Sequence, residues 1–237
     1  MKQSSNWNIF FFILLSLLFF LLIGYQASIG AFDRFNLTAT QAIQQFNHPA
    51  IIGFMQAVSI LEFLAPIIVL VLPVIFYLKK MTAEILFLLL TIGLSVTPKI
   101  LKEIYQLSCP AEPLVHKWQV FHLPYYGPLQ LLKTNFCYPS GHVFNYVLFG
   151  GFLLFLTLRF VKNSSLKFII SILLSSIIAM IGPSRIYLGA HWAGDVVGGY
   201  LLGFSYLLAV ILIYDQREII ARRLKAQSAK IKAKFKA

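Results

Sequence analysis

The sequence predicts an all-α fold, a bundle of six transmembrane helices, on the basis of its composition and its apolar runs. Charged residues make up 12% of the 237 residues and hydrophobic residues 59%, whereas a soluble domain carries about 25% charged residues. Apolar runs of about 20 residues are long enough to cross a bilayer as helices. Six such runs occur, at 8–26, 51–78, 82–104, 141–161, 166–184 and 189–213. We therefore expect an integral membrane protein.

The first run, 8–26, is expected to remain in place as a helix. A cleaved signal peptide is the alternative, because the run is N-terminal and follows Lys2. The apolar stretch is longer than a typical signal-peptide core, and no small-residue cleavage site follows it cleanly. The pattern therefore favours a transmembrane helix.

The later runs end at proline or polar residues. The second run is longer than one span, so its first turns can lie in the interface, and Pro66 and Pro73 are candidate kinks. Lysines 79–80 close this run, Pro139 precedes the fourth run, and the polar segment 162–165 separates the fourth from the fifth. These boundaries predict short connections everywhere except at 108–138.

The distribution of basic residues predicts the orientation. With both termini in the cytoplasm, fourteen of the twenty Lys and Arg residues lie inside and six outside. We expect one domain, 1–214, in a bacterial inner membrane, with an outer loop at 108–138 and a cytoplasmic tail at 215–237. The basic tail should lie on anionic lipid headgroups, at about 1 kcal/mol per cation. Nucleic-acid binding is the weaker alternative, because no aromatic interleaving or binding fold accompanies the charge.

This topology gathers polar residues of four segments at the outer end of the bundle. With the third and fifth runs pointing outward, Lys102 and Arg185 end at the same face. The turn 139–142 and His191 begin the inward runs at that face. The sequence therefore predicts one composite site there.

A histidine and an aspartate at this face have the spacing of a catalytic pair. His191 and Asp195 are four residues apart, so on a helix they share a face. The carboxylate can keep one imidazole nitrogen protonated while the other attacks phosphorus. A carboxylate within a span is costly and indicates function, although a position at a helix start lowers that cost. We interpret His191 as the nucleophile.

The sequence Pro139-Ser140-Gly141-His142 opens the fourth run. Proline and serine suit a helix start, and glycine lets the backbone approach a ligand. Free N–H groups at such a start bind anions. His142 can then protonate a leaving oxygen as general acid. A plain capped helix start is the alternative for the turn taken alone.

Two cations complete the predicted site. Arg185 and Lys102 would neutralise phosphate oxygens, and the guanidinium of Arg185 can do so with two hydrogen bonds. Interfacial snorkelling is the alternative for both side chains. Lys99 competes with Lys102 for the same role.

At these residues the chain resembles the type 2 phosphatidic acid phosphatase family, which shares its site with the vanadium haloperoxidases. Three blocks mark that family: a lysine, six residues and Arg-Pro; Pro-Ser-Gly-His; and Ser-Arg, five residues, His, three residues, Asp. The second and third blocks are complete here, and the resemblance covers about 30–213. It implies that His191 forms a phosphohistidine supported by Asp195, and that His142 protonates the leaving group and later activates water. It implies no metal or other cofactor, and it assigns phosphate binding to Lys102, Ser140, Gly141 and Arg185.

The first block departs from the family pattern. Six residues after Lys102 the sequence reads Cys109-Pro110, so a cysteine stands where the family places a phosphate-binding arginine. A missing guanidinium should weaken the stabilisation of a phosphoryl transition state. We hypothesise that Lys117 or Lys133, in the outer loop, supplies the missing charge.

The outer loop also holds the two cysteines of the chain. Thiols outside the cytoplasm can be oxidised, and we predict a disulfide between Cys109 and Cys137, worth about 3 to 4 kcal/mol through its constraint on the unfolded chain. The alternative is a zinc site formed by Cys109, Glu112, His116 and His122. Its ligand spacings match no familiar zinc motif.

Two further polar features carry less information. Glu62 lies in or near the second run, where it either serves function or touches solvent at the interface. The tripeptide 36–38 has the pattern of a glycosylation acceptor. A simpler interpretation of Asn36 is a helix cap before the polar stretch 39–47.

The expected function is hydrolysis of a phosphomonoester or diphosphate on a lipid, with the headgroup entering at the outer leaflet. Undecaprenyl diphosphate, phosphatidic acid, phosphatidylglycerol phosphate and a lipid A phosphate are all candidate substrates. A phosphotransferase using the same intermediate is one alternative. A non-catalytic protein that binds anionic lipid is the other, since Cys109 is compatible with a decayed site.

The hypothesis about the outer-loop lysines has a direct test. Replacing the lysine that contacts phosphate by methionine, in K117M or K133M, should lower kcat/KM by about 10-fold or more, because a charge-assisted hydrogen bond is lost. Lipid phosphate hydrolysis by the two purified variants measures this effect. Full activity in both variants would reject the hypothesis.

Overall fold

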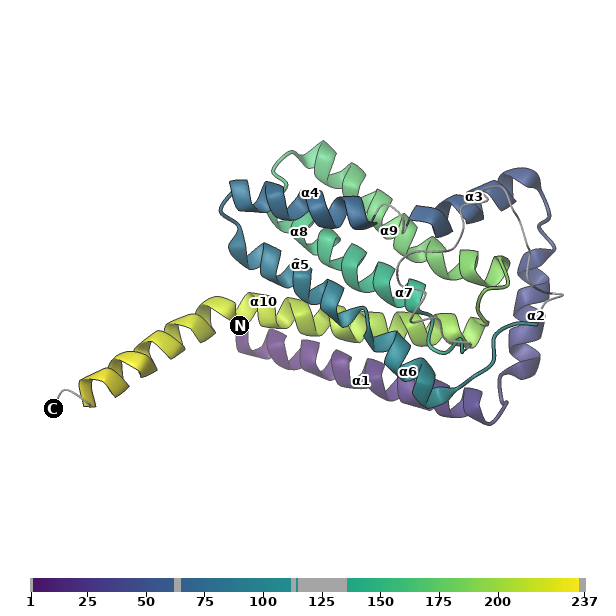
Figure 1. Ribbon diagram of the computed structural model, residues 1–237, viewed down its shortest axis with the longest axis horizontal. Helices are drawn as coiled ribbons and strands as arrows, with labels where there is room; N and C mark the ends of the chain where they lie inside the picture. Colours follow the sequence, from purple (N-terminus) through teal and green to yellow (C-terminus); the bar gives the residue numbers. More distant parts are fainter. Residues whose placement is uncertain (1, 62–64, 112–113, 115–135, 235–237) are drawn as a thin grey trace.

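The computed structural model of the protein describes residues 2–61, 65–111, 114 and 136–234, and most of them are helical (Figure 1). No strand is present among these residues, only an isolated antiparallel bridge between Ser108 and Phe136. The helices are α1 (Lys2–Ser28), α2 (Asp33–Gln44), α3 (Pro49–Ile60), α4 (Ala65–Leu78), α5 (Thr82–Leu94), α6 (Thr97–Tyr105), α7 (Gly141–Asn145), the π-helical turn η4 (Tyr146–Gly150), α8 (Gly151–Phe160), α9 (Ser164–Tyr187) and α10 (Ala193–Lys234).

Five helical segments are long and apolar enough to cross a membrane. They are Asn6–Ser28, Thr82–Tyr105, Gly141–Phe160, Ser164–Tyr187 and Ala193–Arg217. Each overlaps a run predicted from the sequence, so the all-α transmembrane bundle is confirmed. The last of them begins four residues later than predicted, because the chain turns between Tyr187 and Ala193.

The second predicted run, 51–78, contains two helices, α3 and α4. Residues 62–64 between them, with Glu62, lie outside the described part. At 1.5 Å per residue, the 12 and 14 residues of these helices extend only about 18 and 21 Å, less than the hydrocarbon thickness of about 30 Å. Pro66 stands in the first turn of α4, where proline is well tolerated, so it marks a helix start rather than a kink.

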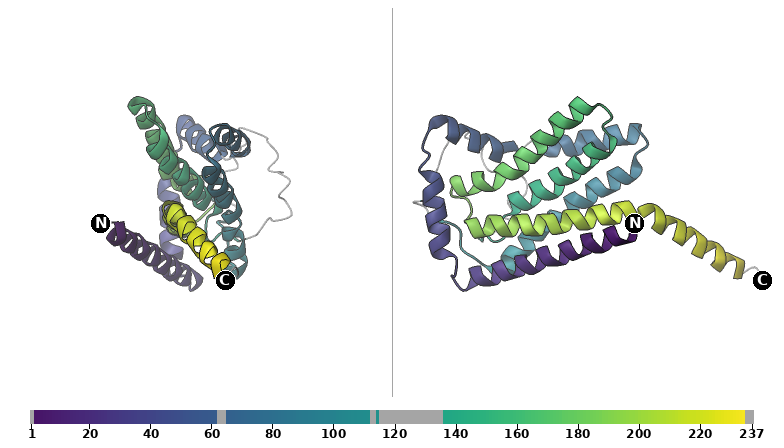
Figure 2. Two further views of the ribbon diagram at one scale, coloured as in Figure 1. Left: turned by 90° about the vertical axis from the view of Figure 1, so that its left-hand side faces the viewer. Right: turned by 180° about the vertical axis from the view of Figure 1, so that it is seen from behind.

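Helix α1 is part of the bundle, as the sequence favoured. It runs alongside α10 in both figures (Figures 1 and 2). The hydroxyl of Tyr138 donates to the carbonyl oxygen of Phe20 at 2.8 Å, and the Ser16 hydroxyl donates to that of Leu201 at 2.8 Å. The ring of Phe20 stacks on that of Tyr138, with centroids 5.6 Å apart. These contacts fix α1 against α10 and against the segment that leads into α7.

Helix α10 presents a face of glycines to that same segment. A Cβ atom on Gly198 would lie 2.5 Å from the ring of Tyr138, and one on Gly199 would lie 2.7 Å from the carbonyl oxygen of Ser140. A Cβ on Gly203 would come within 2.8 Å of Val147. Only a residue without a side chain permits this approach. The glycines therefore let α10 and the start of α7 pack backbone against backbone.

The opposite end of the bundle carries a second polar cluster. Glu84 of α5 is buried and accepts a short hydrogen bond from the hydroxyl of Tyr214. Arg217 lies 3.7 Å from the same carboxylate, with its guanidinium over the Tyr214 ring. Arg159 pairs with Asp215 at 2.6 Å. The cluster thus joins α5, α8 and α10 where the apolar part of α10 ends.

The predicted boundary between the membrane domain and the tail, at residues 214 and 215, lies within a continuous helix. Helix α10 continues without a break to Lys234, and its last part leaves the bundle (Figure 1). The basic tail predicted from residue 215 is therefore a helical extension of the last span. Its placement on anionic headgroups stays a prediction.

The close approach at Gly199 predicts a specific defect. In G199A the new methyl group would meet the Ser140 carbonyl, which is backbone and cannot rotate away. Overpacking of this kind costs about 1 to 3 kcal/mol, and we expect a lower melting temperature in detergent.

The matched control is G53A. A Cβ on Gly53 of α3 meets nothing within 4 Å, and alanine in a helix is favoured over glycine by about 0.5 to 1 kcal/mol. This variant should melt at the same or a higher temperature. If G199A behaves like G53A, backbone packing at Gly199 does not constrain the site.

Candidate active site

Ser140 joins the start of α7 to α10. It is the N-cap of α7, with its hydroxyl 3.5 Å from the Val143 N–H group. Its own N–H group donates to the carbonyl oxygen of Asp195 at 2.9 Å. The residue is completely buried. The turn that the sequence interpreted as a helix start is one, and it is bonded directly to the helix that carries Asp195.

The five residues between Arg185 and His191 form the turn that ends α9. Gly189 has φ of 66°, in the left-handed region that glycine adopts without strain. The N–H groups of Ala190 and His191 both point back to the carbonyl oxygen of Arg185, at 3.0 and 3.3 Å. This arrangement is that of a glycine-terminated helix end. It brings the His191 side chain close to Arg185 although the chain has reversed direction.

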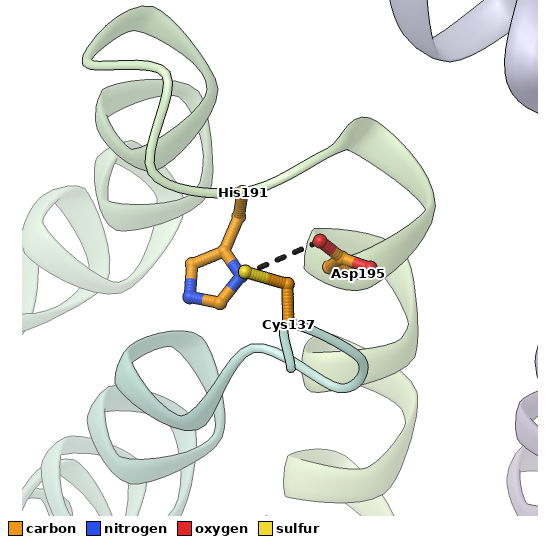
Figure 3. Close-up of side chains that lie close together, drawn as sticks. All are labelled: Cys137, His191 and Asp195. Carbon is orange, nitrogen blue, oxygen red and sulfur yellow. Dashed lines mark hydrogen bonds and ion pairs between the residues drawn. The ribbon is translucent and has the colours of Figure 1, made fainter. Parts of the chain in front are cut away.

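His191 and Asp195 form a buried pair (Figure 3). Nδ1 of His191 lies 3.4 Å from Oδ2 of Asp195, and each side chain is only 4% exposed. The same carboxylate oxygen accepts a hydrogen bond from the Trp192 N–H group at 2.9 Å. Asp195 thus also stabilises the start of α10, as an acidic residue in a first helical turn does. One carboxylate serves the helix and the histidine together.

His191 lies between the spans, and its surroundings keep it uncharged. Burial is the main cause that lowers its pKa well below the ordinary value of 6.5, and the positive charges of Arg185 and Lys102 act in the same direction. A neutral imidazole has one N–H and one lone pair. With Nδ1 facing the carboxylate, the lone pair falls on Nε2, which points away from Asp195 in Figure 3.

His142 and the two cations lie at the same end of the bundle. The ring centroids of His142 and His191 are 6.3 Å apart. Lys102 is in the last turn of α6, and it interacts electrostatically with Asp195, Arg185 and Lys99. The structure therefore brings together the predicted residues of all four segments. Lys117 and Lys133 lie outside the described residues.

Arg185 is held by a residue that the sequence analysis missed. Its Nη1 donates to the hydroxyl of Ser59 at 2.5 Å. Ser59 lies on the buried side of α3, the short helix into which the second apolar run is divided. A serine in an apolar run carries no spacing signal that connects it to an arginine 126 residues later. The contact depends on the packing of α3 against α9.

Asn36 has a role that differs from both predicted ones. It lies inside α2 and is 7% exposed, so it is neither a cap of its own helix nor an accessible glycosylation acceptor. Its Oδ1 accepts a hydrogen bond from the Gly194 N–H group at 3.0 Å, in the first turn of α10. Helix α2 lies across this end of the bundle (Figure 1). Asn36 therefore caps α10 from a distant segment.

The two cysteines are bonded to each other next to His191. Cys109 and Cys137 form a disulfide with Cα atoms 5.1 Å apart. The Cys137 sulfur lies 3.5 Å from the carbonyl oxygen of Ala190, on the Asp195 side of the histidine ring (Figure 3). The other residues of the alternative zinc site, at 112, 116 and 122, lie outside the described part of the chain.

Comparisons with known proteins show the family and the fold of the chain. Residues 83–219 match the sequence model of the PAP2 superfamily. Phosphatidylglycerophosphatase B of Bacillus subtilis (strain 168) is 29% identical over 211 residues, which cover 86% of this chain and 94% of that protein. The crystal structure of a transmembrane PAP2 type phosphatidylglycerolphosphate phosphatase from Bacillus subtilis is similar, with a TM-score of 0.70 and 27% identity over 86% of this chain and 96% of that one.

The lowered pKa of His191 predicts how stability depends on pH. Below 6.5 an unfolded histidine takes up a proton, whereas the buried ring resists protonation, so the unfolded state binds more protons. The stability that the neutral ring provides is complete above 6.5 and is lost as pH falls towards the lowered pKa. We expect the melting temperature in detergent to fall more steeply below 6.5 in the wild type than in H191Q. Equal pH slopes for the two proteins would contradict this prediction.

Proposed function

The chain belongs to the PAP2 superfamily and is a membrane lipid phosphatase, and we propose that His191 is its nucleophile. The observation that carries this proposal is the buried pair in which Nδ1 faces Asp195 at 3.4 Å and Nε2 points away from that carboxylate. A neutral, oriented imidazole can attack without first losing a proton.

The proposed reaction has two steps. In the first, the Nε2 lone pair attacks phosphorus, the bond from phosphorus to the lipid oxygen breaks, and protonated His142 gives its proton to that oxygen. In the second, the now neutral His142 takes a proton from water, the resulting hydroxide attacks phosphorus, and the P–N bond breaks to release phosphate. The centroids of the two rings lie 6.3 Å apart, and the transfer of the phosphoryl group would take place between the two histidines. General acid–base catalysis of this kind contributes about 10²- to 10⁴-fold.

The remaining residues would bind the phosphoryl oxygens. Lys102 and Arg185 bring positive charge to the site from α6 and α9, and charge-assisted hydrogen bonds are about twice as strong as neutral ones. Gly141 would add its N–H group at the start of α7, and Ser140 its hydroxyl, because the Ser140 N–H group is bonded to the Asp195 carbonyl oxygen. The proposed mechanism routes no step through a metal ion, so we propose that hydrolysis continues when a chelator is present.

We propose phosphatidylglycerol phosphate as the first substrate to test, because the names of the similar proteins refer to it as their substrate. Phosphatidic acid, undecaprenyl diphosphate and a lipid A phosphate complete the panel. We further propose that both termini are cytoplasmic and that the site faces the outer side of a bacterial inner membrane. The excess of basic residues at the opposite end supports this orientation.

The decisive experiment compares the wild type with H191A in detergent, with chelator present, on this panel. Loss of the nucleophile should lower kcat by about 10³-fold or more. Acid-labile phosphate should be trapped on the wild-type protein and not on the variant. H48N is the matched control, because His48 is an exposed residue that caps α3 and asparagine can cap in its place.

Each other outcome identifies a different function. Hydrolysis that survives in H191A would reject His191 as nucleophile. Phosphate that appears on an added alcohol instead of in solution would identify a phosphotransferase. Lipid binding without turnover on any substrate would identify the decayed site. The orientation is rejected if intact spheroplasts fail to hydrolyse substrate supplied to their outer surface.

A further inference from the structure

Three potential metal ligands lie close together beside the start of α10. The Cys137 sulfur, a ring nitrogen of His191 and a carboxylate oxygen of Asp195 all lie within 4.8 Å of one another, and all three residues are buried. In Figure 3 the sulfur and the carboxylate lie on the Nδ1 side of the ring. Thiolate, imidazole and carboxylate are ligands that zinc binds in proteins.

The disulfide prevents this set from binding a metal. Thiolates, and not disulfide sulfurs, are the strong ligands of zinc, and the sulfur of Cys137 is bonded to that of Cys109. The oxidised protein therefore offers only the nitrogen and the carboxylate. Reduction would add the thiolate of Cys137 at its present position. The thiolate of Cys109 would lie next to it, because the two sulfurs are bonded in the oxidised protein.

We propose that reduction of the Cys109–Cys137 bond creates a site for zinc or a similar thiophilic divalent cation. Its ligands are Cys137, Nδ1 of His191 and Asp195, with Cys109 as the fourth. Two thiolates, one imidazole and one carboxylate complete the four-coordinate shell that zinc prefers. The disulfide thus protects the reactive histidine from metal as long as it stays oxidised.

The reduction can begin at the exposed half of the bond. Cys109 is exposed, whereas Cys137 is 3% exposed. A thiolate of a dithiol reductant attacks the Cys109 sulfur, and the S–S bond breaks with Cys137 leaving as thiolate beside His191. The second thiol of the reductant then displaces Cys109. The balance is one dithiol oxidised to a disulfide and one protein disulfide reduced to two thiols.

A metal ion bound to Nδ1 would make His191 unable to act as a nucleophile. Neutral imidazole has a single lone pair, so a metal on Nδ1 places the proton on Nε2 and removes the lone pair that attacks phosphorus. This consequence rests on the function proposed above. Metal binding itself rests only on the geometry of the three side chains.

The test of binding uses cobalt(II) with full-length protein in detergent. The protein is reduced with dithiothreitol, desalted without oxygen and titrated with cobalt chloride. We expect a thiolate-to-cobalt charge-transfer band and the visible bands of tetrahedral cobalt, and neither in the oxidised protein. Absence of the thiolate band in the reduced protein, or an identical spectrum in the oxidised one, would overturn the proposal.

Two single-cysteine variants form a matched pair. C109S and C137S both lack the disulfide and both retain one thiol, but only C109S keeps it beside His191. Micromolar zinc should abolish hydrolysis by C109S without any reductant and leave C137S with most of its own zinc-free rate. Equal inhibition of the two variants would show that the Cys137 thiol is not a ligand.

The same titration separates this inference from the proposed function. In reduced wild-type protein, zinc should lower hydrolysis to the level of H191A, and a chelator should restore it. A cobalt spectrum with thiolate bands, combined with undiminished hydrolysis, would reject His191 as nucleophile while supporting the metal site. If both variants fail to fold, the comparison of oxidised with reduced wild type still decides the question.

Discussion

The geometry of the site depends on one backbone contact between α10 and the start of α7. The Ser140 N–H group donates to the carbonyl oxygen of Asp195, and Gly199 leaves room for the Ser140 carbonyl one turn further along α10. This contact fixes the distance between the turn that carries His142 and the helix start that carries Asp195. Tyr138 extends it to α1 through its hydrogen bond with Phe20. Helices that are far apart in the sequence are thereby held at a common end.

Much of this arrangement could be predicted from the sequence. Apolar runs placed five spans within a few residues, and the direction of each span predicted that Lys102, Arg185 and His191 would meet at one face. The spacing of four residues predicted the pairing of His191 with Asp195. These properties are local or follow from the alternation of spans across a bilayer, so a single sequence contains them.

The contacts that support the site could not be predicted in the same way. The hydrogen bonds from Arg185 to Ser59 and from the Gly194 N–H group to Asn36 connect segments more than 100 residues apart. No spacing in the sequence marks these residues as partners. The division of the second run into α3 and α4 is signalled only by Pro66. Such contacts follow from tertiary packing, which overrides the local pattern of a chain.

The departure at Cys109 has a structural counterpart. Where the family pattern places a cation, this chain has Cys109, which is bonded to Cys137. The disulfide carries no charge, and its Cys137 sulfur contacts the carbonyl oxygen of Ala190, in the turn before His191. The site thus gives up a cation at this position and gains a constraint on the loop. Among the described residues, Lys102, Arg185 and the neighbouring Lys99 supply the positive charge.

Helix α10 also has a consequence for the membrane around the protein. Asp195 and Asp215 are 20 residues apart on this continuous helix, or about 30 Å, which equals the thickness of the hydrocarbon layer. The buried pair occupies one end, and the ion pairs of Asp215 and Glu84 occupy the other. The depth of the histidine relative to the lipid headgroups is therefore set by hydrophobic matching. A bilayer thicker than this helix would draw the headgroups away from Nε2, so membrane thickness would determine how closely they approach His191.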